Sequence, residues 1–210
     1  MAEKRKTAVG RSHAERRREA ETRILQAALK IIAKRGVDQL TLAEAGEAAG
    51  YSRALPAHYF GSRDDLLAAV AAHVVETYRQ RLRTDERREG PRGLEALLEG
   101  VAFYIEDSRK SPTRLRGFYE VLYAGLRHAS IAPSIAKLNQ DSAGSFARNI
   151  RAAQERGEVR ADLDPETEGE IVIAALRGLM TQWLIAPDAV DLDKTRDALV
   201  AGLRRNWAKV

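Results

Sequence analysis

The sequence predicts an all-α protein of about nine helices, and three observations support this fold class. Apolar residues recur at helical spacing along most of the 210 residues, and no stretch shows the apolar–polar alternation of a half-buried strand. Several of these stretches follow a hydroxyl residue paired with an acid three positions later, as in helix capping boxes. Prolines stand in the expected first turn of others, where a missing amide hydrogen costs least.

Three capping boxes mark helix starts in the first third of the chain. In each box the hydroxyl can accept a hydrogen bond from an orphan amide while the acid reaches back to the cap. The first box is Ser12 with Glu15, and its helix is expected to end at Gly36. The second is Thr41 with Glu44, with the helix end at Gly50. The third is Ser62 with Asp65.

A further short helix is expected directly after the turn at Gly50, with Ser52 as its N-cap. Arg53 to Leu55 would then fill its first turn, so Pro56 removes only the first regular helical hydrogen bond and does not break the helix. Two short helices joined by a glycine turn form a helix-turn-helix, whose second helix enters the major groove of DNA. The sequence therefore predicts double-stranded DNA as a partner.

The chain divides into three parts by charge and helical pattern. We expect a basic flexible tail (residues 1–11), a helix-turn-helix head (residues 12–70) and a helical body (residues 71–210). The long helix after Ser62 runs into a polar stretch ending at Gly90-Pro91, the most linker-like position of the chain. Five body helices are expected to begin near Gly93, Pro112, Pro133, Pro165 and Leu192.

Positive charge is concentrated at the front of the chain. Residues 1–65 hold 13 Lys and Arg against 9 Asp and Glu, whereas residues 66–210 hold 22 against 21. Such a basic segment attracts phosphate backbones, anionic membranes or acidic proteins. For the tail alone, a solvated and partly disordered segment is an equally good interpretation.

Several classes of protein are disfavoured by what the sequence lacks. The absence of cysteine excludes disulfides, thiol chemistry and cysteine-ligated zinc. The polar start gives no sign of a secretion signal, and the apolar window from Ile171 to Ala186 is short for a membrane span, so we expect a cytoplasmic protein without membrane contact. We expect no metal, no cofactor and no enzymatic activity, because neither phosphate-loop nor serine-elbow motifs occur and the histidines are scattered: His13, His58, His73 and His128.

The residues from Ile24 to Val70 combine an "ILxAAL…RG" first helix, a "T…AG.S" helix-turn, an "HYF" exit and a "GSRDDLL" start of the next helix. This stretch resembles the DNA-binding head of the TetR family of bacterial transcriptional regulators. The chain departs from the family at Ala57, where a phosphate-contacting tyrosine is common, and His58 or Tyr59 could replace that contact. The resemblance implies an N-terminal DNA-binding head and a body for ligand binding and dimerisation.

Side-chain chemistry assigns roles within the head. Arg53 is the best candidate for reading bases, because a guanidinium can bind guanine O6 and N7 with two parallel hydrogen bonds. Leu55 is a candidate for contact with a thymine methyl group, and Ala54 lies between them on the expected DNA-facing turn. The candidates for phosphate contact are Thr41, Ser52, His58, Tyr59 and Arg63. Helix capping for Thr41 and Ser52, and core packing for Tyr59, are the alternative explanations.

The helix expected from Pro165 is apolar on nearly every side, which indicates that both flanks are covered. Its small residues would allow another backbone to approach closely. The resemblance implies that this helix and the last one form a four-helix interface between two chains. The expected interface residues are Ile171, Ala175, Gly178, Leu179, Leu199, Leu203 and Trp207.

The resemblance also implies a small-molecule pocket inside the body, whose occupancy moves the two heads apart. Aromatic and large apolar residues of the body are its candidate lining, and ordinary core packing is the alternative for each. These candidates are Phe103, Tyr104, Phe118, Tyr119, Tyr123, Met180 and Trp183. They suggest a largely apolar effector.

Two functions follow from these observations. The first is a TetR-type regulator, most often a repressor in this family, that binds a palindromic operator as a homodimer and is released by a small ligand. The alternative is a helical small-molecule-binding or interaction protein whose head has lost DNA binding, as Ala45, Gly46 and Ala57 could indicate. Salt-dependent binding to duplex DNA separates the two.

Overall fold

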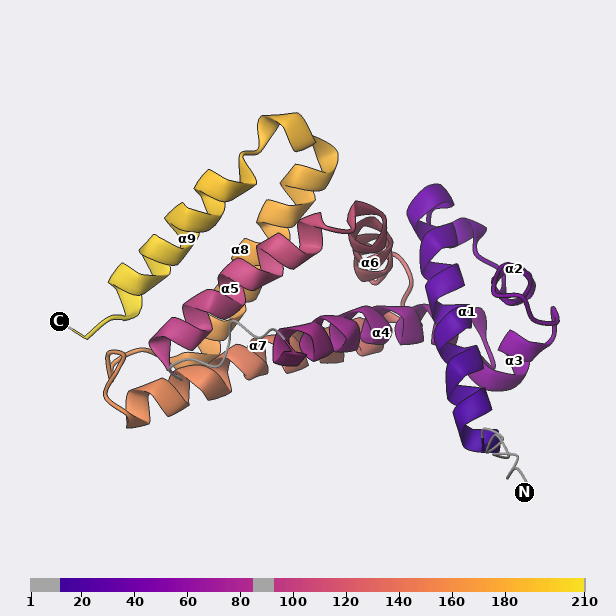
Figure 1. Cartoon of the computed structure of the whole chain (residues 1–210), viewed down its shortest axis with the longest axis horizontal. Helices are drawn as coiled ribbons and strands as arrows, with labels where there is room; N and C mark the ends of the chain where they lie inside the picture. The colour runs from indigo at the N-terminus through magenta and orange to yellow at the C-terminus, as the bar shows by residue number, and fades with distance from the viewer. Residues whose placement is uncertain (1–11, 85–92, 210) are drawn as a thin grey trace, which may run out of the picture.

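The computed structural model describes residues 12–84 and 93–209, which form nine α-helices and two 3-10 helices (Figure 1). The prediction of an all-α fold is confirmed, and every expected helix except the one at Ser52 begins within one residue of its predicted start. The tail (residues 1–11) and Gly90-Pro91 lie outside the described residues. The elements are α1 (His13–Arg35), η1 (Val37–Gln39), α2 (Leu42–Ala48), α3 (Leu55–Phe60), α4 (Arg63–Thr84), α5 (Leu94–Arg109), α6 (Pro112–Ala124), α7 (Ala132–Glu155), α8 (Pro165–Ile185), η3 (Pro187–Ala189) and α9 (Leu192–Trp207).

Side-chain caps fix the helix starts of the first third. The boxes that begin at Ser12 and Ser62 are complete, with hydrogen bonds in both directions between cap and acid. Thr41 Oγ1 accepts from the Glu44 amide at 3.1 Å, but the Glu44 carboxylate pairs with Arg35 of α1 instead of reaching back. This third cap therefore also attaches α2 to α1.

The head and the body meet along α1, α4 and α6 (Figure 1). In Figure 1, α2 and α3 lie on the side of α1 away from the body, while α8 and α9 lie at the opposite end of the molecule. Helix α4 runs without a break across residue 70, from the head into the centre of the body. A movement of α4 in the body therefore reaches the head through a continuous helix.

The joint between α1 and α6 depends on a glycine. A Cβ atom at Gly117 of α6 would stand 2.6 Å from the backbone oxygen of Leu29 and 2.6 Å from its Cδ1 atom. No side chain fits at that distance. Gly117 therefore allows the backbone of α6 to pack directly against the backbone and side chain of Leu29 in α1. Leu29 is buried in this contact.

No helix in the described ranges has a window that is long and apolar enough to cross a bilayer. Helix α8 does not, however, have the fully covered surface that its sequence suggested. Ile171 is 49% exposed and Ile185 is 79% exposed, on the face that carries Gly178. One face of α8 is thus uncovered in the single chain.

Candidate DNA-binding surface and effector cavity

The turn between α2 and α3 differs from the prediction in where the second helix begins. The predicted start at Ser52 is wrong: Ser52 to Ala54 form a turn, closed by a 3.2 Å hydrogen bond from the Leu55 amide to the Ser52 carbonyl, and α3 begins at Leu55. The N-cap is Ala54, which provides no capping side chain. Pro56 consequently stands in the first helical turn, where its missing amide hydrogen is tolerated.

Gly46 of α2 and Pro56 of α3 pack directly against each other. A Cβ atom at Gly46 would lie 2.6 Å from the Ser52 carbonyl oxygen and 3.0 Å from the Pro56 ring. The glycine inside α2, which costs helix propensity, therefore lets α3 and its turn pack directly against α2. Pro56 is buried in this contact. The junction fixes the orientation of α3 relative to the rest of the head.

The predicted DNA-facing residues are largely accessible. Ser52, Arg53, Ala54 and His58 are exposed, and Leu55 is half-buried. The Arg53 side chain is 71% exposed, and its Nη1 atom lies 2.9 Å from Glu47 Oε1 of α2. An exposed ion pair of this kind contributes little stability, so its guanidinium can exchange Glu47 for another acceptor at low cost.

Two phosphate candidates have structural tasks. Thr41 is exposed and caps α2, as described above. Arg63 donates from Nη2 to the Val37 carbonyl at 2.6 Å and from Nε to the Leu40 carbonyl at 3.1 Å. These bonds anchor η1 to α4, and they favour a structural role for Arg63 over the predicted phosphate contact.

Tyr59 has a partner that the sequence did not reveal. The Arg17 guanidinium of α1 lies over the Tyr59 ring at 5.0 Å from its centre, and it also pairs with Glu21 at 2.8 Å. Tyr59 is half-buried beside the exposed His58. The cation–π contact places a basic side chain of α1 next to α3. Only the fold could show it, because the two residues are distant in sequence.

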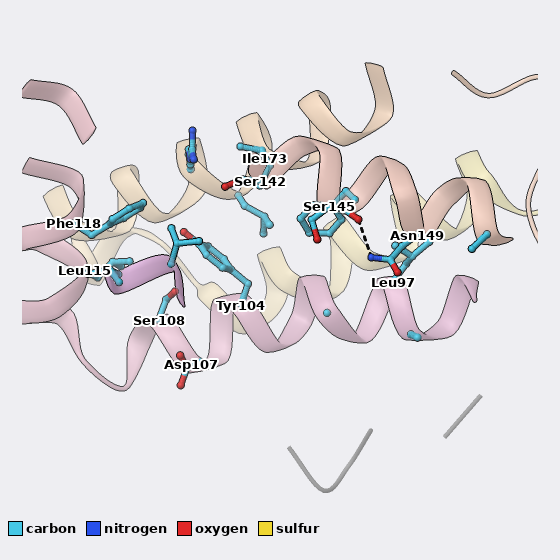
Figure 2. Close-up of a pocket in the computed structure, with 18 of the residues that line it drawn as sticks. Leu97, Tyr104, Asp107, Ser108, Leu115, Phe118, Ser142, Ser145, Asn149 and Ile173 are labelled. Carbon is cyan, nitrogen blue, oxygen red and sulfur yellow. Dashed lines mark hydrogen bonds between the residues drawn. The ribbon is translucent and has the colours of Figure 1, made fainter. Parts of the chain in front are cut away.

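The body contains a cavity of about 460 Å³ between α4, α5, α6, α7 and α8 (Figure 2). This volume lies in the range of small-molecule sites. Figure 2 shows the Tyr104 side chain running from α5 towards Phe118 on α6. Apolar lining residues include Val74, Leu97, Leu115, Phe118, Ile173 and Leu176. Polar lining residues include Asp107, Ser108, Arg114, Ser142, Ser145, Asn149, Arg156 and Arg177.

The predicted pocket residues do not all lie at this cavity. Of the seven candidates, Tyr104 and Phe118 line the cavity. The others lie elsewhere: Phe103, Met180 and Tyr119 are buried in the core, Trp183 is half-buried against it, and Tyr123 is exposed. The apolar surface of Phe103, Tyr119, Met180 and Trp183 packs between helices, the alternative that the sequence left open.

Tyr119 lies directly behind the cavity wall. Its hydroxyl is 3.3 Å from the Tyr104 hydroxyl, so the two form a hydrogen-bonded pair in the body. Burial raises the pKa of both hydroxyls above its usual value. Both tyrosines therefore remain neutral at physiological pH.

The predicted interface residues divide into two groups. Trp207 is 0% exposed, and its Nε1 atom donates to Glu168 Oε2 at 2.8 Å within the chain. Leu203 and Leu179 are also buried in the single chain, and Leu199 packs half-buried against the same core. Leu179, Leu203 and Trp207 already form contacts of α8 and α9 with their own body, so their part in an interface between chains stays a prediction. Ile171, Ala175 and Gly178 remain accessible.

Comparison with known proteins agrees with this architecture. Residues 24–70 match the model for bacterial regulatory proteins of the tetR family, and residues 93–208 match the C-terminal model of BetI-type transcriptional repressors. The chain belongs to the TetR family. The chain is therefore a member of a family of DNA-binding transcriptional regulators. The resemblance predicted for residues 24–70 is confirmed.

Individual relatives span most of this TetR-family chain. The HTH-type transcriptional regulator TtgR of Pseudomonas putida is 26% identical over 182 residues, which cover 85% of this chain and 86% of TtgR. A TetR-family regulator structure from Rhodococcus sp. superposes with a TM-score of 0.79 at 24% identity, over 89% of this chain and 97% of the other. A transcriptional regulator from Saccharomonospora viridis, solved in complex with choline, superposes with a TM-score of 0.69 at 24% identity, over 94% and 100%.

Proposed function

We propose that this TetR-family regulator binds a palindromic operator as a homodimer, represses transcription there, and is released by a small molecule in the cavity of the body. The observation that carries the proposal is the turn and helix from Ser52 to Phe60, in which Ser52, Arg53 and His58 are exposed beside the close-packed junction of Gly46 with Pro56. A single exposed helix of this kind fits the major groove of B-form DNA.

The uncovered face of α8 supports the homodimer. Ile171, Gly178 and Ile185 are accessible on one side of α8, and a Cβ atom at Gly178 would meet no atom within 4 Å. An apolar face with a small residue at its centre suits close contact with the same face of a second chain. Two-fold symmetry would present two α3 helices to successive major grooves, which requires a palindromic site.

The position of α6 supports release by a ligand. Leu115 and Phe118 of α6 line the cavity, and Gly117 between them contacts Leu29 of α1 in the head. A ligand that displaces α6 would therefore displace α1 as well, and it would shift the equilibrium by its difference in affinity for the two arrangements.

Binding of the purified chain to duplex DNA tests the proposal. Affinity for random duplex is expected to fall steeply with salt, because phosphate contacts release counterions. Sequencing of the fragments that the protein enriches from its genome identifies the operator, and light scattering on the complex gives the number of chains. Absence of DNA binding at every salt concentration would favour the alternative, a helical small-molecule-binding protein that has lost DNA binding.

A further inference from the structure

More basic than acidic side chains line the cavity. Among the lining residues that the structure describes, three are arginines and one is an acid, Asp107. Two of the arginines have carboxylate partners: Arg114 Nη2 lies 3.5 Å from Asp107 Oδ2, and Arg156 Nε lies 2.8 Å from Glu158 Oε1. The third, Arg177 of α8, is the exception.

Arg177 has no carboxylate partner among the described residues. Its side chain is half-buried, and its Nη1 atom donates to the Asn139 side-chain oxygen, a neutral acceptor. Burial lowers the pKa of the Arg177 guanidinium, and the nearby hydroxyls of Tyr104, Tyr119 and Tyr123 offset part of that effect. Since burial keeps the hydroxyls of Tyr104 and Tyr119 neutral at physiological pH, no carboxylate or phenolate in the described part of the chain is paired with the charge of Arg177.

We propose that the cavity binds an organic monocarboxylate with a largely apolar body, whose carboxylate pairs with Arg177 beside the Tyr104 hydroxyl. This assignment rests on the proposed function, since it names the effector class of that cavity. The fork of a guanidinium matches the two oxygens of a carboxylate, so the pair can form two parallel charge-assisted hydrogen bonds. The apolar body of the ligand would lie against Leu115, Phe118 and Ile173.

A cationic ligand fits this cavity less well. The Saccharomonospora viridis regulator was solved with choline, which is a cation. Among the lining residues that the structure describes, the one carboxylate, Asp107, already faces Arg114. A cation would have to occupy a cavity in which Arg177 repels it.

Calorimetric titration of the full chain without DNA tests the assignment. Three probes with ten carbons in their main chain are compared, the two ions below their micellar concentrations and the alcohol below its solubility limit: decanoate, decyltrimethylammonium and decanol. Decanoate is expected to bind most tightly, and Arg177→Gln is expected to weaken decanoate by about tenfold or more while leaving decanol within about twofold. Arg148→Gln, on the exposed part of α7 outside the cavity, is the matched control and should change neither.

The outcomes separate this assignment from the proposed function. Unchanged binding of decanol to Arg177→Gln shows that the variant retains its cavity, so a selective loss of decanoate supports the assignment. Binding of decyltrimethylammonium as tight as that of decanoate, or decanoate binding that does not depend on Arg177, overturns it whatever happens with DNA. Arg177-dependent binding of decanoate by a chain that binds no DNA would support the ligand class and refute the regulator.

Discussion

The junction of α2 with α3 and the cavity of the body represent opposite ways of packing helices. At the junction, a glycine and a proline ring leave no room for a single added carbon atom. In the body, five helices enclose about 460 Å³ that their own side chains do not fill. The packed junction allows one orientation of α3. The side chains that line the cavity lack some of the packing contacts of a filled core, and a bound ligand would supply them.

Under the proposed function, this difference suits the two regions to different tasks. A DNA-reading helix must hold its side chains at fixed positions relative to the bases, which a close-packed junction provides. A cavity leaves its lining helices with contacts still to be made, so a ligand that fills it can favour one arrangement of those helices. Rigidity at the reading surface and adaptability at the cavity are both needed for a ligand-controlled regulator.

Gly46→Ala is expected to have the largest effect, because it attacks the packed junction. The added carbon would stand 2.6 Å from the Ser52 carbonyl oxygen, so we expect the free energy of unfolding to fall by about 3 kcal/mol, as for overpacked cores. Chemical denaturation measures it. Gly144→Ala on α7 is the matched control, since the nearest atom to its Cβ is 3.5 Å away, and it should be neutral or slightly stabilising. Equal effects of the two changes would refute a tight junction.

Arg53→Ala is expected to cost about 2 kcal/mol of binding to the operator and to relax its sequence preference, because a base-reading guanidinium is lost. The unfolding free energy should barely change, since the side chain is 71% exposed. Fluorescence anisotropy with operator and with base-substituted duplexes measures the DNA affinity and its sequence preference. Weakening by the same factor on every sequence would instead make Arg53 a phosphate contact.

Arg63→Ala is expected to lower the free energy of unfolding by about 1 kcal/mol, because two backbone carbonyls lose their donor while the site stays partly open to water. Denaturation curves, combined with DNA titrations at several salt concentrations, test the assignment. If stability is unchanged and the salt slope of DNA binding becomes smaller by about one unit, the phosphate role predicted from sequence is correct.

Ala152→Phe is expected to have the smallest effect on stability, because the new ring enters the cavity from α7. We expect the free energy of unfolding to change by less than about 1 kcal/mol. Binding of decanoate should be lost. Large destabilisation in calorimetric melting would mean that the cavity is not available space.

Helix starts could be predicted from sequence because caps are local. Ser12 and Thr41 carry their signals within one turn of the helix that they start, and the structure confirms both. The start of α3 could not be predicted, because it depends on the contact between Pro56 and Gly46. The short sequence of α3 gives no indication of which residue of α2 it contacts. The all-α fold and the DNA-binding head were predictable for the same reason as the caps: their motifs are contiguous.

The cavity and the interface were less predictable, because apolar side chains serve several purposes. A stripe with Leu203 and Trp207 suits contact with another chain as well as with its own body, and here the body uses it. The cavity walls contain small and polar residues such as Ser142, Ser145 and Asn149, which resemble an ordinary helix surface in the sequence. Arg177 offered one readable signal, a charge inside the most apolar window of the chain.

The contact of Gly117 with Leu29 has a consequence for how this regulator can change its ligand. Gly117 contributes only its backbone to that contact. Substitutions of the cavity lining on α4, α5, α7 and α8 change neither Gly117 nor Leu29. Under the proposed function, new ligand preferences can thus arise, by mutation or by engineering, while the contact between α6 and the head is kept. One head would then serve cavities for different ligands.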